Sequence, residues 1–186
     1  TANKTDETLP WVFSCRHGDS QRMKRLLSSI AQNEMLSPTD FTMSVHNAIA
    51  GVFSIVTKNN QSHTALSGGS ASFALGWVEA FAISKQLGTK VGYIYYDWTL
   101  PAEYETFNET QHEKTSFLAI IDSSSNSNNL DDEYIDIQYH KADEYDFTDS
   151  SRDIPNIVDF IVNDKKQCNI GFPGGCLTFQ RAISND

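Results

Sequence analysis

The sequence has no long hydrophobic run and few cysteines, and each shortage argues against a class of protein. No apolar segment reaches the roughly 20 residues that cross a bilayer. The first ten residues (TANKTDETLP) lack the apolar core of a secretory signal. Cys15, Cys168 and Cys176 form no Cys-x-x-Cys pair, which suits free thiols in a reducing compartment. We therefore expect a cytoplasmic protein without a membrane partner.

Positive charge is also scarce, because 14 Lys and Arg residues stand against 24 Asp and Glu residues, a formal net charge of −10. Nucleic acids and anionic membranes attract clustered Lys and Arg, so this composition argues against both. The five histidines lie far apart and lack the spacing of a zinc site. We expect neither a metal nor another cofactor.

The pattern of apolar residues predicts one α/β domain over residues 1–186, with a flexible leader at 1–9 and a layered fold around a mixed β-sheet. Asp19 is expected to cap the first helix, and Leu36–Asp40 to form a loop. A buried helix is predicted over Phe41–Val56, and a second one, capped by Ser70, to about Gln86. Strands are predicted at 11–13, 63–66, 90–97, 115–122 (interior), 133–140 and 176–182, with a further helix at 154–162.

The segment LSGGSASFALGWVEA (66–80) joins a strand, a glycine turn and an apolar helix. A residue at such a helix N-terminus meets the positive end of the helix dipole, which stabilises an anion or a thiolate. The serine-hydrolase elbow has the same topology but requires Gly-x-Ser-x-Gly. Here Gly68–Ser72 gives Gly-x-Ser-x-Ser, and its base would have to be His112 or His140.

Two further groups of polar residues allow more than one interpretation. Cys15 and His17 would share one face of a strand, as a nucleophile and its base do, or His17 only helps the chain to turn. A small acyl-transferring or hydrolytic enzyme using Ser70 or Cys15 is therefore one alternative. His46 and Asn47 lie in the apolar helix, where they need hydrogen-bond partners. They hold a neighbouring loop, or they belong to an interface or a cavity wall.

The pieces SVHNAIAG (44–51) and HTALSGGSASFALG (63–76) resemble β-ketoacyl synthases of the thiolase fold. LPWVFSCRHGD and SPTDFTMSVHNAIAG are closer still to a short ketosynthase-like N-terminal family. That family includes chain-length factors of bacterial aryl polyene and polyketide-type clusters. The similarity covers most of residues 10–100 and implies the N-terminal half of a thiolase-like fold. Relative to the family pattern, the first strand and helix before LPWVF are expected to be absent.

The resemblance places Gly68 or Gly69 where an active ketosynthase has its nucleophilic cysteine. It thus implies a non-catalytic subunit that forms a heterodimer with an active 3-oxoacyl-acyl-carrier-protein synthase. In that role Phe41, Met43 and His46 would bound the acyl tunnel, with Ser44 and Asn47 as supports; Phe41 and Met43 could equally be core packing. Acyl carrier proteins are acidic, so this acidic chain is expected to contact one only indirectly.

Overall fold

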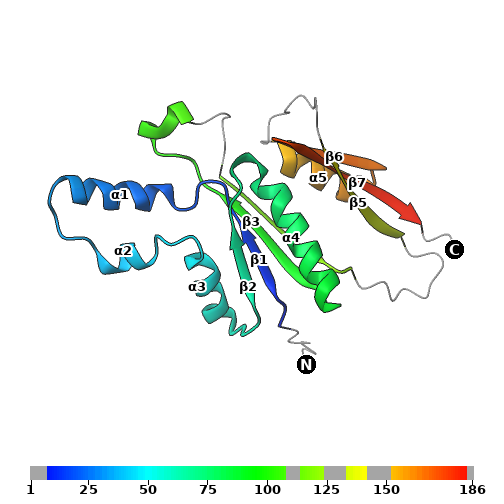
Figure 1. The fold of residues 1–186 in the computed structure, drawn as a ribbon, viewed down its shortest axis with the longest axis horizontal. Coiled ribbons are helices and arrows are strands. Elements are labelled where there is room, and N and C mark those ends of the chain that lie inside the picture. Colours follow the sequence, from blue (N-terminus) through cyan, green and yellow to red (C-terminus); the bar gives the residue numbers. More distant parts are fainter. Residues whose placement is uncertain (1–7, 108–113, 124–132, 142–151, 184–186) are drawn as a thin grey trace.

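The computed structural model describes residues 8–107, 114–123, 133–141 and 152–183, and places α4 between two β-sheets (Figure 1). The first half contains β1 (Trp11–Ser14), α1 (Ser20–Ala31), α2 (Pro38–Thr42), α3 (Ala48–Thr57), β2 (His63–Leu66), the 3-10 turn η1 (Gly69–Ala71) and α4 (Ser72–Leu87). The second half contains β3 (Val91–Asp97), η2 (Ala102–Phe107), β4 (Thr115–Ile121), β5 (Glu133–Lys141), α5 (Asp153–Val162), β6 (Gln167–Phe172) and β7 (Gly175–Ile183).

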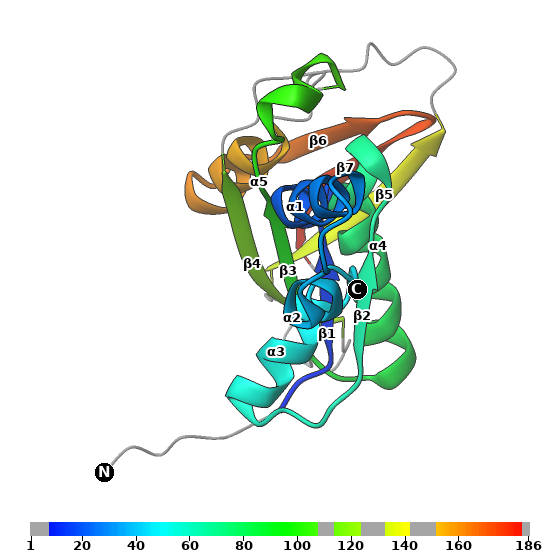
Figure 2. The same cartoon turned by 90° about the vertical axis from the view of Figure 1, so that its left-hand side faces the viewer.

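The larger sheet has the strand order β2-β1-β3-β4, in which β1 is parallel to β2 and β3 while β4 is antiparallel to β3. Its central strand β1 is covered on both faces, because α3 and α4 lie on opposite sides of it (Figure 2). On one face Trp11 and Phe13 pack against Phe53 of α3, with ring centroids 4.8 and 5.4 Å apart. The other face presents Val12 to the main core. The predicted mixed sheet is confirmed.

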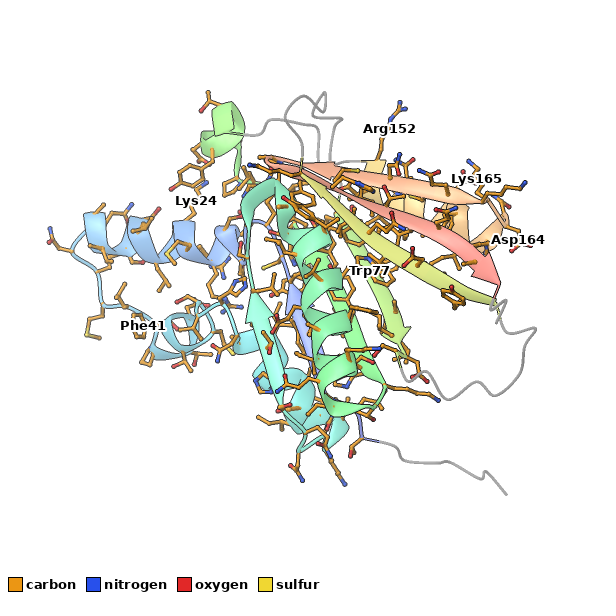
Figure 3. The ribbon with its side chains drawn as sticks, turned by 45° about the vertical axis from the view of Figure 1, so that its right-hand side comes forward. Lys24, Phe41, Trp77, Arg152, Asp164 and Lys165 are labelled. Carbon is orange, nitrogen blue, oxygen red and sulfur yellow. The ribbon has the colours of Figure 1, made fainter. Side chains whose placement is uncertain are left out.

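The second sheet is antiparallel, with the order β5-β7-β6. Phe179 of β7 contacts Trp77 of α4, with ring centroids 5.3 Å apart, and Phe160 of α5, at 6.5 Å. One hydrophobic core therefore joins both sheets and both helices. Trp77 lies at this junction in Figure 3.

The single buried helix predicted over Phe41–Val56 is wrong on two counts. The chain forms α2, turns through residues 43–47, and resumes as α3. The turn forms because both the backbone N–H and the hydroxyl of Ser44 donate to the carbonyl of Phe41, so that carbonyl is diverted from the bond that would continue the helix. The segment is also largely exposed: Phe41 is 62 % exposed and Ile55 77 %.

Three smaller expectations also need correction. Residues 36–40 are not all loop, because Pro38 begins α2 and Ser37 caps it. Ser70 caps no helix and lies inside η1. The strand at β4 is an edge strand rather than an interior one, and its outward residues Leu118 and Ile120 are exposed. Strand β6 was not predicted.

Several sequence predictions lie outside the described ranges, including residues 1–7 of the predicted leader and His112. The single-domain assignment stays a prediction. In the described part of the chain, no helix combines the length and hydropathy needed to cross a bilayer.

Candidate functional site

The carboxyl ends of the three parallel strands β1, β2 and β3 meet at one cavity with a volume of about 600 Å³. Ser67 directly follows β2, Trp98 directly follows β3, and the loop from Arg16 onward follows β1. In open α/β sheets, ligands bind in the crevice beyond the carboxyl ends of the strands. The topology therefore makes this cavity the first candidate for a functional site.

The residues that line the cavity come from two parts of the chain. The strand ends supply Arg16, His17 and Tyr96, whereas α1 and the segment before α3 supply apolar side chains such as Met23 and Met43 and polar ones such as Arg22 and His46. Ser67 links two of the strand ends, because its hydroxyl donates to the carbonyl of Arg16 at 3.1 Å. The lining therefore mixes apolar, polar and cationic side chains.

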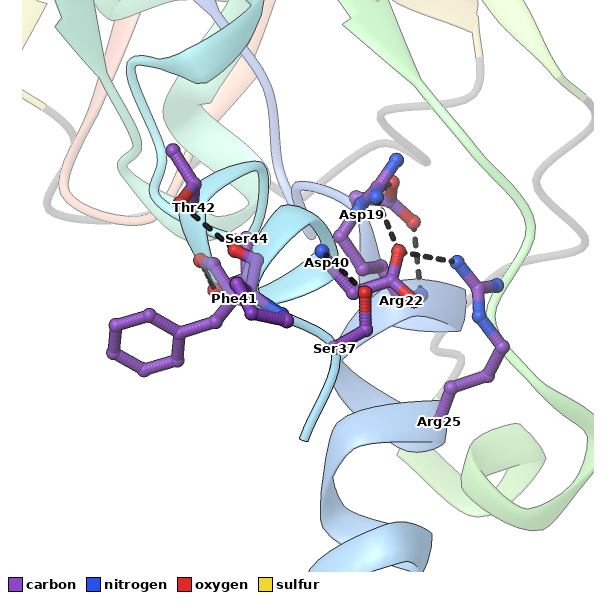
Figure 4. Close-up of polar contacts among 9 residues, drawn as sticks. Asp19, Arg22, Arg25, Ser37, Asp40, Phe41, Thr42 and Ser44 are labelled. Atoms are coloured by element: carbon purple, nitrogen blue, oxygen red, sulfur yellow. Dashed lines mark hydrogen bonds and ion pairs between the residues drawn. The ribbon is translucent and has the colours of Figure 1, made fainter. Parts of the chain in front are cut away.

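Three of the five predicted tunnel residues, Met43, Ser44 and His46, line this cavity. Phe41 does not, because its ring projects away from the neighbouring polar cluster (Figure 4). Asn47 precedes α3 and makes no side-chain capping bond there. The prediction that His46 and Asn47 are buried is wrong, since both are exposed. For His46, the alternative of a cavity wall is the one that the structure supports.

Residues 20–47, hereafter the arm, project from the larger sheet and carry Phe41 (Figures 1 and 3). Salt bridges stabilise the arm. Arg22 contacts Asp19 at 2.9 Å and Asp40 at 2.5 Å (Figure 4). Arg25 contacts Asp40 at 3.5 Å. Lys24 pairs with Glu103 of η2 at 2.5 Å, and this contact helps to lower the pKa of that carboxyl. These contacts fix α1 against α2 and against η2.

The glycine turn lies at the start of α4 and presents no side chain at Gly68 or Gly69. Ser72 stabilises the turn, since its hydroxyl accepts the Gly68 N–H at 2.9 Å and donates to the Gly69 carbonyl at 2.7 Å. Gly69 has φ +61°, the left-handed region that side chains disfavour. A Cβ on Gly68 would lie 2.4 Å from Cδ1 of Leu75. A side chain at Gly69 would strain the backbone, and one at Gly68 would require Leu75 to shift.

One of the two interpretations pairs Cys15 with His17, and the structure brings a different histidine to Cys15. The Cys15 thiol lies 3.6 Å from Nδ1 of His46, while the backbone N–H of His17 donates to Asp97. Cys15 is fully buried, and burial raises the pKa of its thiol despite a hydrogen bond with Tyr96 that lowers it. The thiol is therefore a poor nucleophile at neutral pH.

The positions of the candidate bases do not support the serine-hydrolase interpretation. Of its two candidate bases, His140 lies on β5, where it pairs with Cys176 in the second sheet, and His112 is outside the described ranges. Within the part of the chain that the structure describes, no three His, Cys, Asp or Glu side chains gather as a metal site would require.

Sequence reasoning missed Arg16, Met23, Tyr96, Trp98 and Tyr104 as cavity residues. A usable signal exists for two of them, because Trp98 directly follows the strand predicted at 90–97 and Arg16 lies three residues after the one predicted at 11–13. Met23 lies on α1 and Tyr104 in η2. Their convergence depends on the path of the arm, which local patterns do not specify.

Residues 1–174 match the family model described as the N-terminal domain of β-ketoacyl synthase. The chain belongs to this family. Its structure is similar to one chain of the complex between the ketosynthase ApeO and its chain length factor ApeC from Xenorhabdus doucetiae. The TM-score is 0.78 at 21 % identity, covering 94 % of this chain and 70 % of the other. It is also similar to the ishigamide ketosynthase/chain length factor, with a TM-score of 0.59 at 16 % identity over 75 % of this chain and 43 % of that one.

No curated protein matches the sequence. The predicted resemblance to the β-ketoacyl synthase family is thus confirmed, and so is the thiolase-like ketosynthase fold. At these identities the structural similarity shows the fold alone.

Proposed function

We propose that this chain is a non-catalytic chain-length factor. It forms a heterodimer with an active 3-oxoacyl-acyl-carrier-protein synthase and bounds the acyl tunnel of the complex. The pathway would be fatty-acid-like synthesis of the aryl polyene or polyketide type. The observation on which the proposal mainly rests is the glycine pair Gly68–Gly69 at the start of α4.

A glycine cannot form an acyl-enzyme, because it has no side-chain nucleophile. Gly68 and Gly69 stand just before α4 in a ketosynthase-like fold, and the positive φ of Gly69 disfavours a side chain there. The turn thus keeps the family's architecture without a group able to attack a thioester. A partner subunit would therefore have to supply the nucleophile that attacks the thioester.

The exposed apolar surface of α3 supports pairing with such a partner. Val52, Ile55 and Val56 are 43, 77 and 75 % exposed. Exposed apolar patches that are large for a monomer mark interaction sites. We expect the chain to be poorly soluble alone and to co-purify with the synthase as a one-to-one complex.

Phe41 and the cavity residue Met43 would limit the length of the acyl chain by sterically excluding further carbons. Ser44, His46 and Asn47 would support them. Each extra carbon forced against a packed wall costs on the order of 1–3 kcal/mol. Phe41 would act across the interface, since it projects from the arm (Figure 3). Met43 would act within this subunit.

The test is product length in the reconstituted complex. Phe41→Ala should allow longer products while leaving the one-to-one complex intact, because it removes a bulky ring rather than the pairing surface of α3. Met35→Ala is the matched control, since Met35 is 97 % exposed on the same arm. Unchanged product length with Phe41→Ala would refute the tunnel role, and a stable, active monomer would refute the whole proposal.

The second candidate is a small acyl-transferring enzyme, favoured only by the Cys15–His46 contact at 3.6 Å. Incubation with an acyl-thioester, followed by intact-mass analysis, separates the two. A covalent adduct that Cys15→Ser or Ser70→Ala abolishes would establish the enzyme. We expect no adduct, because burial raises the pKa of the Cys15 thiol.

A further inference from the structure

Strand β5 lies at an edge of the second sheet, whose order is β5-β7-β6. It pairs with β7 without interruption from Glu133 to Lys141, so no bulge bends it. Among the residues that the structure describes, no strand pairs with its other side. Natural edge strands are commonly short, or carry proline, bulges or lysines that prevent pairing with another chain. This strand has nine residues, no proline and a lysine only at its last position, so its outer edge can accept a further strand.

Apolar side chains are exposed along the same strand. Tyr134, Ile135 and Tyr139 are 51, 40 and 58 % exposed. The Tyr139 ring is already held in place, because it stacks on Phe172 with ring centroids 6.3 Å apart and its hydroxyl donates to the Gly174 carbonyl at 3.0 Å. A side chain that is fixed beforehand loses little rotamer freedom when a partner covers it. β5 thus offers an apolar contact that a paired strand would cover at low entropic cost.

The sequence of β5 (EYIDIQYHK) is complementary to itself when two copies run antiparallel with Ile137 opposite Ile137. All nine residues then have a partner. Ile135 lies opposite Tyr139 of the second copy, which is a favourable aromatic and β-branched pair. Glu133 lies opposite Lys141 at each end, which brings residues of opposite charge together twice. The complementarity of charge and of apolar residues favours a second copy of this chain as the partner strand.

Asp136 and Gln138 distinguish this register from its neighbours. The Gln138 amide donates to the Asp136 carboxylate of its own strand at 2.6 Å, and in the register centred on Ile137 it also lies opposite the Asp136 carboxylate of the second copy. Centring the pairing on Asp136 would place two carboxylates opposite each other, which is destabilising. Centring it on Gln138 would carry Glu133 beyond the end of the other strand, so its contact with Lys141 would be lost.

We propose that a second copy of this chain pairs with the first through β5, antiparallel about a twofold axis at Ile137. The two second sheets then join into one continuous sheet of order β6-β7-β5-β5-β7-β6, held by main-chain hydrogen bonds. The α3 surface proposed for the synthase lies on the far side of the larger sheet (Figure 1). Both surfaces can therefore be occupied at once, which joins two heterodimers and keeps the subunit ratio at one to one. The inference goes beyond the proposed function and does not depend on it.

The test is sedimentation velocity of the full chain over a range of concentrations. Ile55→Glu is present in every sample, because it removes the exposed apolar contact of α3 and leaves β5 unchanged. This parent chain should show a concentration-dependent equilibrium between monomer and dimer. Circular dichroism verifies that each variant folds. A parent chain that stays monomeric at every concentration would overturn the proposal.

Exchanging the two charges tests the register. Lys141→Glu and Glu133→Lys should each raise the dissociation constant of the dimer at least about fivefold, because each places like charges opposite each other at both ends of the pairing. The double variant should restore the parent value. Lys166→Glu is the matched control, since Lys166 is an exposed lysine just before β6, and it should change nothing. Single variants that dimerise like the parent, or a double variant that does not recover, would refute the pairing.

Hydrogen exchange identifies the covered edge and its occupant. At concentrations where the dimer forms, the amides of β5 should exchange more slowly than in dilute solution, and those of β4, an edge of the larger sheet, should not. Slower exchange at β4 instead, or at β5 only after the synthase is added, would overturn the proposal. Co-purification of the chain without Ile55→Glu tests the proposed function separately. A β5 dimer without co-purification would refute that function alone, and co-purification without the dimer would refute this inference alone.

Discussion

At the scale of single residues, the packing of Tyr93 against Gly76 joins α4 to β3. The Tyr93 hydroxyl donates to the Phe73 carbonyl at 2.7 Å, so the Ser14 hydroxyl, 2.9 Å away, must donate to it in turn. A Cβ on Gly76 would lie 2.3 Å from the Tyr93 ring. The close approach of helix and strand therefore depends on glycine at this position.

Gly76→Ala should lower the free energy of unfolding by about 1–3 kcal/mol, the cost of overpacking a core. The matched control is Gly51→Ala in α3, where nothing lies within 4 Å of the added Cβ. That change should be neutral or stabilising by roughly 0.5–1 kcal/mol, because alanine suits a helix better. Urea denaturation of both variants measures the difference, and equal stabilities would contradict the packing argument.

Buried acids at the residue scale also make stability depend on pH. Burial raises the pKa of Cys168 from 9.0 to about 11, and it raises the pKa values of Cys15 and Tyr93 as well. The folded chain holds these protons more tightly than the unfolded chain does. The free energy of unfolding should therefore be constant below the unfolded-state values and fall as pH rises above about 9.

Urea denaturation between neutral pH and about pH 10 checks this expectation. Cys168→Ala should reduce the slope of that loss, because one of the shifted groups is removed. A stability that stays constant across the range would contradict it.

At the scale of elements, the sequence predicted the strands and the helix cap that have strong local signals. It did not predict features that depend on where an element lies in the tertiary structure. The strands at Trp11–Ser14 and His63–Leu66 and the cap at Asp19 agree with the structure. The apolar run TSFLAII suggested an interior strand, yet β4 is at an edge, because a run of apolar residues does not reveal whether both neighbours exist. Likewise, the apolar run from Phe41 concealed a turn that Ser44 makes.

Prediction of the candidate site from local sequence patterns had the same limit. Met43, Ser44 and His46 could be selected by resemblance, and they line the cavity. The contact of Cys15 with His46 spans 31 residues of sequence. No local pattern predicts such a contact, since it depends on how the arm folds back over β1.

The start of α1 offers an element-scale test, because the Asp19 side chain accepts the Arg22 N–H at 2.9 Å. Asp19→Ala should cost about 1 kcal/mol of unfolding free energy through loss of the cap. Asp19→Asn keeps the acceptor and should cost less. Thermal denaturation of both variants measures the effect, and an equal loss would show that the ion pair with Arg22 matters rather than the cap.

At the scale of the whole molecule, the described part of the chain exposes apolar side chains on α3. Ile55→Glu should leave the chain folded, because Ile55 is 77 % exposed, and should prevent co-purification with the synthase. Val162→Glu is the control, since Val162 is 69 % exposed at the end of α5 and lies outside the proposed pairing surface. Circular dichroism verifies folding, and size-exclusion chromatography of the co-expressed pair measures complex formation. Complex formation by Ile55→Glu would contradict the assignment of α3.

The central place of β1 in its sheet has a consequence for synthesis on the ribosome. β1 pairs at Trp11–Ser14 with His63–Leu66 and with Gly92–Tyr95, so both of its neighbours emerge long after it does. Pairings so distant in sequence form slowly, and until they form the apolar side chains of β1 and α3 stay open to other chains. We expect yield to depend on how soon a chaperone or the partner subunit reaches the nascent chain, and slower translation after about the first hundred residues should therefore improve recovery of soluble protein.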